Sequence, residues 1–131
     1  WPCGTAKVLL ALHGPAQQAL PGGALRVTRA KNALLEMQRA NGAWGGCKGG
    51  EPSIEETALA LEALAGVTEN DVDAQAKLEK ARDRGAHWLV EKVENGEWTE
   101  PSPIGFYFAK LWYFEKLYPM IATVAALSRL R

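Results

Sequence analysis

The chain has 131 residues, enough for one domain, and 47% of them are hydrophobic, which can support a buried core. Fifteen Lys and Arg residues balance fifteen Asp and Glu residues, so there is no basic field to attract nucleic-acid phosphates. We therefore expect no nucleic-acid partner. The apolar runs are well short of the roughly 20 residues that a membrane-spanning helix needs.

Two cysteines, Cys3 and Cys47, are too few for a disulfide scaffold, and their spacing matches no metal-binding motif. They are interpreted as free thiols in a reducing, cytoplasmic compartment. No metal site is expected.

Helical patterns separated by Gly and Pro run along the whole chain, after a short loop at residues 1–4. Ser102-Pro103 is a good helix start, since proline fits the first turn, and Pro119 forces a new helix start. The sequence predicts helices at residues 5–12, 24–40, 53–65, 73–92, 103–118 and from 119 to about 130.

Three of these helices share a pattern of Thr, a small or β-branched residue, and two later Leu residues. They are TAKVLLAL from Thr5, TALALEAL from Thr57 and TVAALSRL from Thr123. These helices are apolar nearly all round, so they must be covered on every side, whereas helices 24–40 and 73–92 are apolar on one stripe. The alternation predicts an all-α fold in two layers, either a solenoid or a closed α/α toroid.

A second repeat joins the end of a helix to a glycine turn and a tryptophan. It occurs as RAKNALLEMQRANGAW from Arg29 and as RGAHWLVEKVENGEW from Arg84. Gln38 can bond backbone groups at the start of a neighbouring helix, while Trp44 buries a large apolar area over that join. We interpret Gln38, Trp44 and Trp98 as structural residues that tie consecutive helical pairs together.

These residues resemble the QW motif of the squalene-hopene cyclase family of class II triterpene cyclases. Arg29-Ala30, Leu34, Gln38, Gly42 and Trp44 match it, with Ala33 at a usually aromatic place, while the second copy has Val93 in place of Gln. The resemblance implies that residues 1–131 are the C-terminal part of an α/α toroid, roughly half a ring. An exposed apolar edge is then expected, covered by the missing N-terminal part or by self-association.

The family protonates an alkene or epoxide with a neutral aspartic acid held in a dry cavity, without metal or redox cofactor. The resemblance implies an isoprenoid substrate such as squalene and an intramolecular transferase (isomerase) activity leading to hopanoid-like triterpenoids. The acid motif's frame falls on Ser53–Ala58, where Glu55 holds the proton donor's place. The alternative is a capping box of Ser53 and Glu56, with the true acid upstream.

Aromatic residues crowd the segment after Ser102 and can stabilise a cation by up to about 2 kcal/mol in a dry site. The resemblance places Tyr107 and Phe108 at the substrate cavity, and the candidate substrate-binding residues are Tyr107, Phe108, Phe106 and Trp112. Some of them can pack in the core instead. We expect Tyr107 or Phe108 to border an internal apolar cleft.

Two other functions remain open. A protein prenyltransferase shares the toroid but needs zinc, for which Cys47, Asp73 and His87 supply the ligand types. A non-catalytic toroid module, for binding or scaffolding, fits a chain that has lost the acid motif. The resemblance also implies peripheral membrane contact, and the 131-residue chain alone is expected to be inactive.

Overall fold

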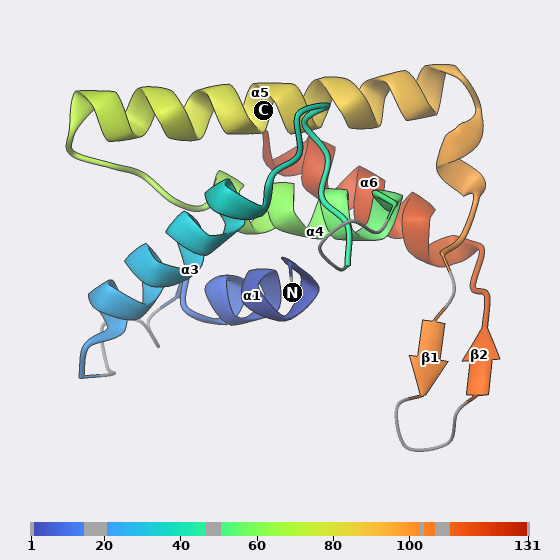
Figure 1. Cartoon of the computed structure of the whole chain (residues 1–131), viewed down its shortest axis with the longest axis horizontal. Helices are drawn as coiled ribbons and strands as arrows, with labels where there is room; N and C mark the ends of the chain where they lie inside the picture. The colour runs from blue at the N-terminus through green and yellow to red at the C-terminus, as the bar shows by residue number, and fades with distance from the viewer. Residues whose placement is uncertain (1, 15–20, 47–50, 103, 107–110, 131) are drawn as a thin grey trace.

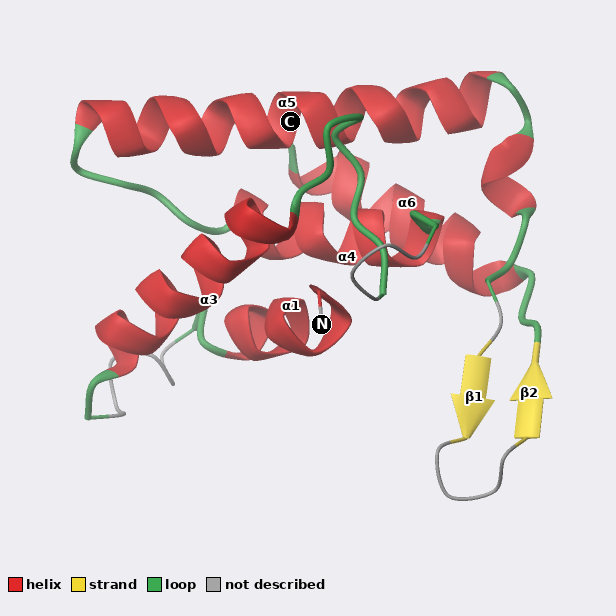
Figure 2. Ribbon diagram, in the orientation of Figure 1, coloured by secondary structure: helices red, strands yellow, loops and turns green. Residues whose placement is uncertain are grey.

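The computed structural model describes residues 2–14, 21–46, 51–102, 104–106 and 111–130, with only the backbone of 104–106 and 111–113. The described residues form helices, apart from one short hairpin, so the expected helical character is confirmed (Figures 1 and 2). The elements are α1 (Pro2–Ala11), α3 (Gly23–Met37), α4 (Ile54–Ala65), α5 (Val72–Glu94), the 3-10 helix η1 (Glu97–Thr99), β1 (Ile104–Phe106), β2 (Leu111–Tyr113) and α6 (Leu117–Arg129).

The three apolar helices pack in a row, with α4 between α1 and α6. Each amphipathic helix covers one member of that row, α3 on α1 and α5 on α4 (Figure 1). The expected pairing of apolar and amphipathic helices is therefore present among the described residues.

Helix α4 is the centre of the core. Ala58, Ala60, Leu61, Ala63 and Leu64 have no exposed surface, because other helices and the turn around Trp44 surround α4. The prediction that apolar helices are covered on every side is confirmed for α4 alone.

The end members of the row, α1 and α6, each keep an open side. Val8 of α1 is 54% exposed, and Ile121 and Val124 of α6 are 62% and 60% exposed. For α1 and α6 the expectation of complete cover was wrong, because each has a neighbour of its own kind on one side only. We call the exposed residues of α6 and its approach the α6 apolar face: Phe114, Leu117, Tyr118, Ile121 and Val124.

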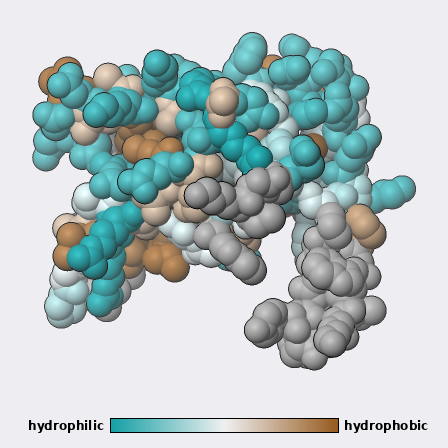
Figure 3. Space-filling view, in the orientation of Figure 1, coloured by the Kyte–Doolittle hydropathy of each residue, from teal (hydrophilic) through white to brown (hydrophobic). Residues whose placement is uncertain are grey.

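Helix α5 buries one stripe and turns the rest of its surface to solvent. The buried residues are Leu78, Ala81, Gly85, Trp88 and Leu89, and the intervals of three and four residues from 78 to 85 and from 85 to 88 and 89 place them on one stripe. Figure 3 shows mainly hydrophilic surface along this helix. Its N-cap is Asp71, whose carboxylate accepts a hydrogen bond of 2.8 Å from the N–H of Ala74.

The predicted helix at 103–118 is wrong. Residues 104–106 and 111–113 form an antiparallel hairpin in which Ile104 pairs with Tyr113 and Phe106 with Leu111, and it extends away from the helices (Figure 2). The β-branched and aromatic residues of this segment favour strands, and Gly105 weakens a helix. Helix α6 begins at Leu117, so Pro119 lies within its first turn, where its missing N–H costs nothing.

The start of the chain also differs from expectation, since α1 begins at Pro2 and includes residues 2–4 that were predicted as a loop. Proline at the first helical position explains the earlier start. Within the described residues, none of the helices combines the length and the apolar character needed to cross a bilayer.

The central position of α4 predicts unequal effects of two identical substitutions. Leu64→Ala should lower the free energy of unfolding by about 2–5 kcal/mol, since it leaves a cavity at a residue with no exposed surface. Leu25→Ala, at a position 55% exposed on α3, should change it by less than about 0.5 kcal/mol. Urea unfolding followed by circular dichroism measures both, and equal effects would contradict the assignment of α4 as the core.

Candidate functional site

Gln38 lies just after α3 and joins that helix end to α5. Its side-chain amide donates hydrogen bonds to the carbonyl oxygens of Gly42, at 2.9 Å, and of Ala81, at 2.8 Å. The predicted structural role of Gln38 as a backbone ligand therefore agrees with these contacts. Its partner is in the middle of α5, however, and not at the start of a helix as expected.

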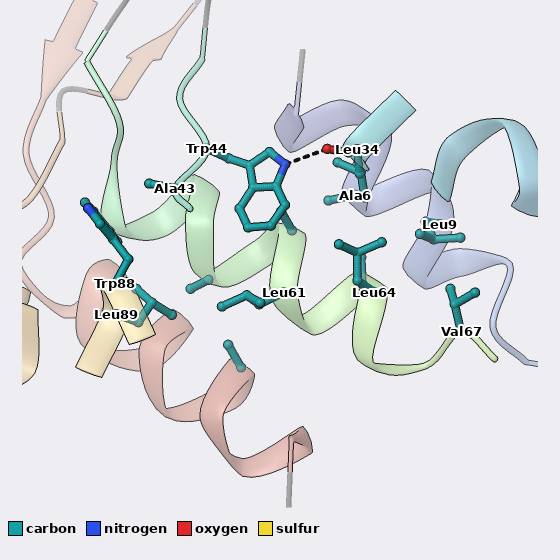
Figure 4. Packing of buried hydrophobic residues seen from close by; sticks show 14 of the residues in the cluster. Ala6, Leu9, Leu34, Ala43, Trp44, Leu61, Leu64, Val67, Trp88 and Leu89 are labelled. Carbon is teal, nitrogen blue, oxygen red and sulfur yellow. Dashed lines mark hydrogen bonds between the residues drawn. The ribbon is translucent and has the colours of Figure 1, made fainter. Parts of the chain in front are cut away.

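Trp44 is completely buried, and Figure 4 shows its indole nitrogen bonded to Leu34. Its backbone N–H and carbonyl group are bonded as well. The indole N–H donates to the carbonyl oxygen of Leu34 in α3, at 2.7 Å. The backbone N–H of Trp44 donates to the hydroxyl of Thr57 in α4, at 3.0 Å, and that hydroxyl donates back to the Trp44 carbonyl at 3.2 Å. One residue thus ties α3 to α4. We call Gln38, Trp44 and Thr57 the Trp44 clamp.

Arg84 and Gly85 of α5 form the receiving side of the Trp44 clamp. The guanidinium of Arg84 donates to the carbonyl oxygens of Arg39, at 2.8 Å, and Ala40, at 2.6 Å. A Cβ at Gly85 would lie 2.7 Å from the Trp44 ring, so only glycine allows this close approach. Sequence reasoning recognised the Arg-Gly pair as part of the repeat but missed that it receives the turn of the other copy.

Gly42 makes the turn itself possible. Its φ is +92°, in the left-handed region that glycine tolerates, and a Cβ there would lie 2.5 Å from the carbonyl oxygen of Arg84. Both the conformation and the contact with α5 therefore require glycine.

The second copy of the motif lacks the hydrogen bonds that join the helices in the first copy. Val93 stands where the first copy has Gln38, so it supplies no amide donor. Trp98, in η1, is only half-buried, and the Thr123 hydroxyl, the counterpart of Thr57, is buried without a hydrogen-bond partner. The predicted structural role of Trp98 is supported by its packing against the core, but it makes no equivalent clamp with Thr123.

A groove with a volume of about 340 Å³ lies at this open copy. We call it the Trp98 groove, and it is lined by Val93, Trp98, Thr123, Val124, Leu127 and Ser128. It lies between the end of α5, η1 and α6, where a second clamp of the Trp44 kind would have joined the end of α5 to α6.

Glu55, the candidate remnant acid, makes a structural contact. Its carboxylate oxygens accept hydrogen bonds from the backbone N–H of Ser102, at 2.9 Å, and from the Ser102 hydroxyl, at 2.8 Å. These bonds attach the first turn of α4 to the segment that precedes β1. The hydroxyl of Ser53 caps α4 by accepting from the N–H of Glu56 at 3.2 Å, as the capping alternative predicted.

The surroundings of Glu56 perturb the acidity of its carboxyl group. Burial raises the pKa of the Glu56 carboxyl, and the hydrogen bond with Ser53 opposes that shift. The N–H of Ser53 donates to the Trp44 carbonyl at 3.1 Å, so the second bond of a full capping box is replaced by a bond to the Trp44 clamp.

Of the four aromatic candidates, the structure describes two, and of those two only the backbone. Tyr107 and Phe108 lie outside the described residues. Phe106 and Trp112 fall in β1 and β2, where only the backbone is described. Their predicted place on a helix was wrong, and their roles in binding remain predictions.

The zinc alternative cannot use both of its ligands on α5. Asp73 and His87 both lie on α5, 14 residues apart, which separates them by roughly 21 Å along the helix axis. They cannot bind one ion, since zinc–ligand distances are about 2 Å. Cys47 lies outside the described residues, and among the described ones no cluster of three His, Cys, Asp or Glu could hold a metal.

Comparison with known proteins finds no matching family model, no matching curated protein and no matching solved structure.

The two copies predict opposite effects of the same substitution. Thr57→Val should lower the free energy of unfolding by about 1–3 kcal/mol, because it leaves the buried N–H of Trp44 without an acceptor. Thr123→Val should leave it unchanged or raise it by about 1 kcal/mol, because it removes a buried hydroxyl without a partner. Guanidinium unfolding curves of both variants test this, and similar losses in the two would refute the difference between the copies.

The raised pKa of Glu56 predicts a pH-dependent stability. The folded state binds the Glu56 proton more tightly than the unfolded state does. Burying the ionised carboxyl therefore lowers the free energy of unfolding, and this effect is fully present above the folded pKa. Glu56→Gln should therefore stabilise the protein at pH 7, by a fraction of about 1 kcal/mol because the group is partly exposed to solvent. This gain should shrink as pH falls through the folded pKa. Thermal melts of both proteins from pH 7 to pH 4 measure it, and a gain that grows on acidification would contradict the burial effect.

Proposed function

We propose that the chain forms the C-terminal part of an α/α toroid of the squalene-hopene cyclase type. Its inner helices and aromatic segment would form part of the apolar wall around an isoprenoid substrate such as squalene. The observation that carries this proposal is the Trp44 clamp. Gln38, Trp44 and Thr57 join successive helical pairs through backbone atoms, which is the physical role that the motif of that family would serve.

In this proposal the chain supplies walls and not the proton donor. Glu55 is bonded through both carboxylate oxygens to Ser102, which suits a residue that attaches two segments. The acid that starts cyclisation would then lie in another part of the protein, and the 131 residues alone would be inactive. The row of α1, α4 and α6 would contribute one side of the ring.

The α6 apolar face supports the partners expected with this function. Its five exposed residues recur at three- and four-residue spacings along one side of the helix and its approach. Such a face suits contact with the rest of a toroid, with a second copy, or with a membrane surface from which a lipid-soluble substrate is taken.

A non-catalytic toroid module is the second candidate. The hydrogen bonds between Glu55 and Ser102 support it as much as they support a cyclase wall without a proton donor. Both candidates share the architecture and the Trp44 clamp. They differ in whether an isoprenoid is bound and turned over by the protein that contains this chain.

The proposal predicts which residues lie close to a bound isoprenoid. A photoreactive squalene analogue, irradiated with the 131-residue chain, should label peptides from residues 104–130, and excess squalene should suppress the labelling. Peptide mass spectrometry locates the adducts. The hydrophilic surface of α5, within residues 72–94, serves as the internal control. Labelling spread evenly over both regions, or not suppressed by squalene, would count against an isoprenoid wall.

The acid's place is tested in the full-length protein. Glu55→Gln keeps a carbonyl oxygen for the Ser102 N–H, so the attachment should persist and cyclisation of squalene should stay within about twofold. Loss of turnover in a correctly folded Glu55→Gln protein would show that Glu55 is the proton donor. Absence of both labelling and turnover in the unmodified protein would favour the scaffold.

A further inference from the structure

His13 follows the end of α1, and its imidazole ring packs against the end of α4. A Cβ at Gly66, the C-cap of α4, would lie 2.4 Å from the Nδ1 atom of that ring, so the ring lies directly against the backbone. Both imidazole nitrogens are buried, and neither has a hydrogen-bond partner in the described part of the chain. This packing does not suit an imidazolium, whose two N–H groups both need acceptors.

The backbone carbonyls that flank Gly66 already bind a cation. The guanidinium of Arg82, from α5, donates hydrogen bonds to the carbonyl oxygens of Leu64 and Val67. A protonated His13 would therefore compete with a guanidinium for these oxygens.

Positive charges act on His13 from both helices that approach this end of α4. Burial lowers the pKa of His13 below that of an ordinary histidine, and the charges of Arg129 on α6 and Arg82 on α5 lower it further. Arg129 itself pairs with Glu62 of α4 at 3.1 Å. Among the described residues, no carboxylate lies within salt-bridge distance of His13. The surroundings therefore offer an imidazolium nothing that replaces water.

Apolar contacts hold α1 to α4 and end at His13. Leu9 and Leu12 are 0% and 6% exposed, and Leu9 belongs to the same buried cluster as Leu64 (Figure 4). The hydrogen bonds of the Trp44 clamp, in contrast, join α3, α4 and α5. A change at His13 can therefore loosen α1 without breaking the clamp.

We propose that His13 is an acid-sensitive switch, whose protonation releases α1 from α4 and uncovers the apolar surface around Leu9 and Leu64. Above about pH 6.5, the pKa of an ordinary histidine, His13 is neutral in both states and α1 stays docked. Below that pH the released state binds the proton more tightly, so docking weakens until the lower pKa of docked His13 is reached. The inference does not depend on the proposed cyclase function, because it uses neither Glu55 nor the aromatic candidates.

Hydrogen exchange followed by mass spectrometry tests the switch in the 131-residue chain from pH 7.5 to pH 5, after correction for the intrinsic pH dependence of exchange. Protection of residues 2–14 should fall at least about threefold over this range, within the limit of about tenfold per pH unit that one proton sets. Protection of α5, within residues 72–94, should stay constant. The raised pKa of Glu56 acts in the opposite direction, so it cannot produce this loss.

The second histidine of the chain, His87, is exposed on α5 and provides the matched control. His13→Gln, which cannot be protonated in this range, should abolish the acid effect, whereas His87→Gln should preserve it. His13→Phe is a second variant with an apolar ring, so the result does not depend on how Gln packs. Arg129→Gln removes one nearby positive charge, so the pKa of His13, followed by NMR, should rise.

Three results would overturn the inference. The first is an unmodified chain whose α1 protection does not change with acid. The second is an equal loss of protection in α1 and α5, which would mean that the whole fold opens. The third is an acid effect that persists in both His13 variants.

Discussion

The fold depends on the burial of one tryptophan turn between three helices. Trp44 has no exposed surface, bonds α3 through its indole and α4 through its backbone, and lies against Gly85 of α5. An unsatisfied N–H at this depth would cost about 1–3 kcal/mol, more than the net worth of the hydrogen bond itself. The positions of the helices that supply its partners are therefore coupled. This is why Gly42, Gln38 and Gly85 must accompany the tryptophan.

The same requirement that buried polar groups be hydrogen-bonded explains the role of the residues at the start of α4. Ser53, Glu55 and Thr57 all bond other segments, so the residues in the frame of the acid motif act as connectors. A proton donor for a hydrocarbon substrate needs the opposite setting, a neutral acid facing a dry cavity. In the proposed function, the chain would therefore shape the cavity, and another part of the protein would supply the acid.

The two copies of the motif differ in the connection that follows the tryptophan. In the first copy a short connection brings the turn back to Thr57, and the join is closed. In the second copy the hairpin lengthens the connection, Val93 replaces the glutamine, and a groove remains beside Thr123. The α6 apolar face is open for a related reason, since α6 has no later member of the row beside it among the described residues.

The sequence by itself determined the helices that carry periodic patterns, the cap at Ser53 and the structural part of Gln38 and Trp44, because these depend on spacing and local bonding. It did not predict the paired strands at 104–106 and 111–113, since aromatic residues suit both helices and strands and the surroundings decide between them. Tertiary structure alone decided that Arg84 and Gly85 receive the turn, that Glu55 binds Ser102 and that Thr123 lacks a partner. The contacts of Arg84, Gly85 and Glu55 each join residues more than ten positions apart, and local patterns cannot determine which distant atoms a side chain reaches.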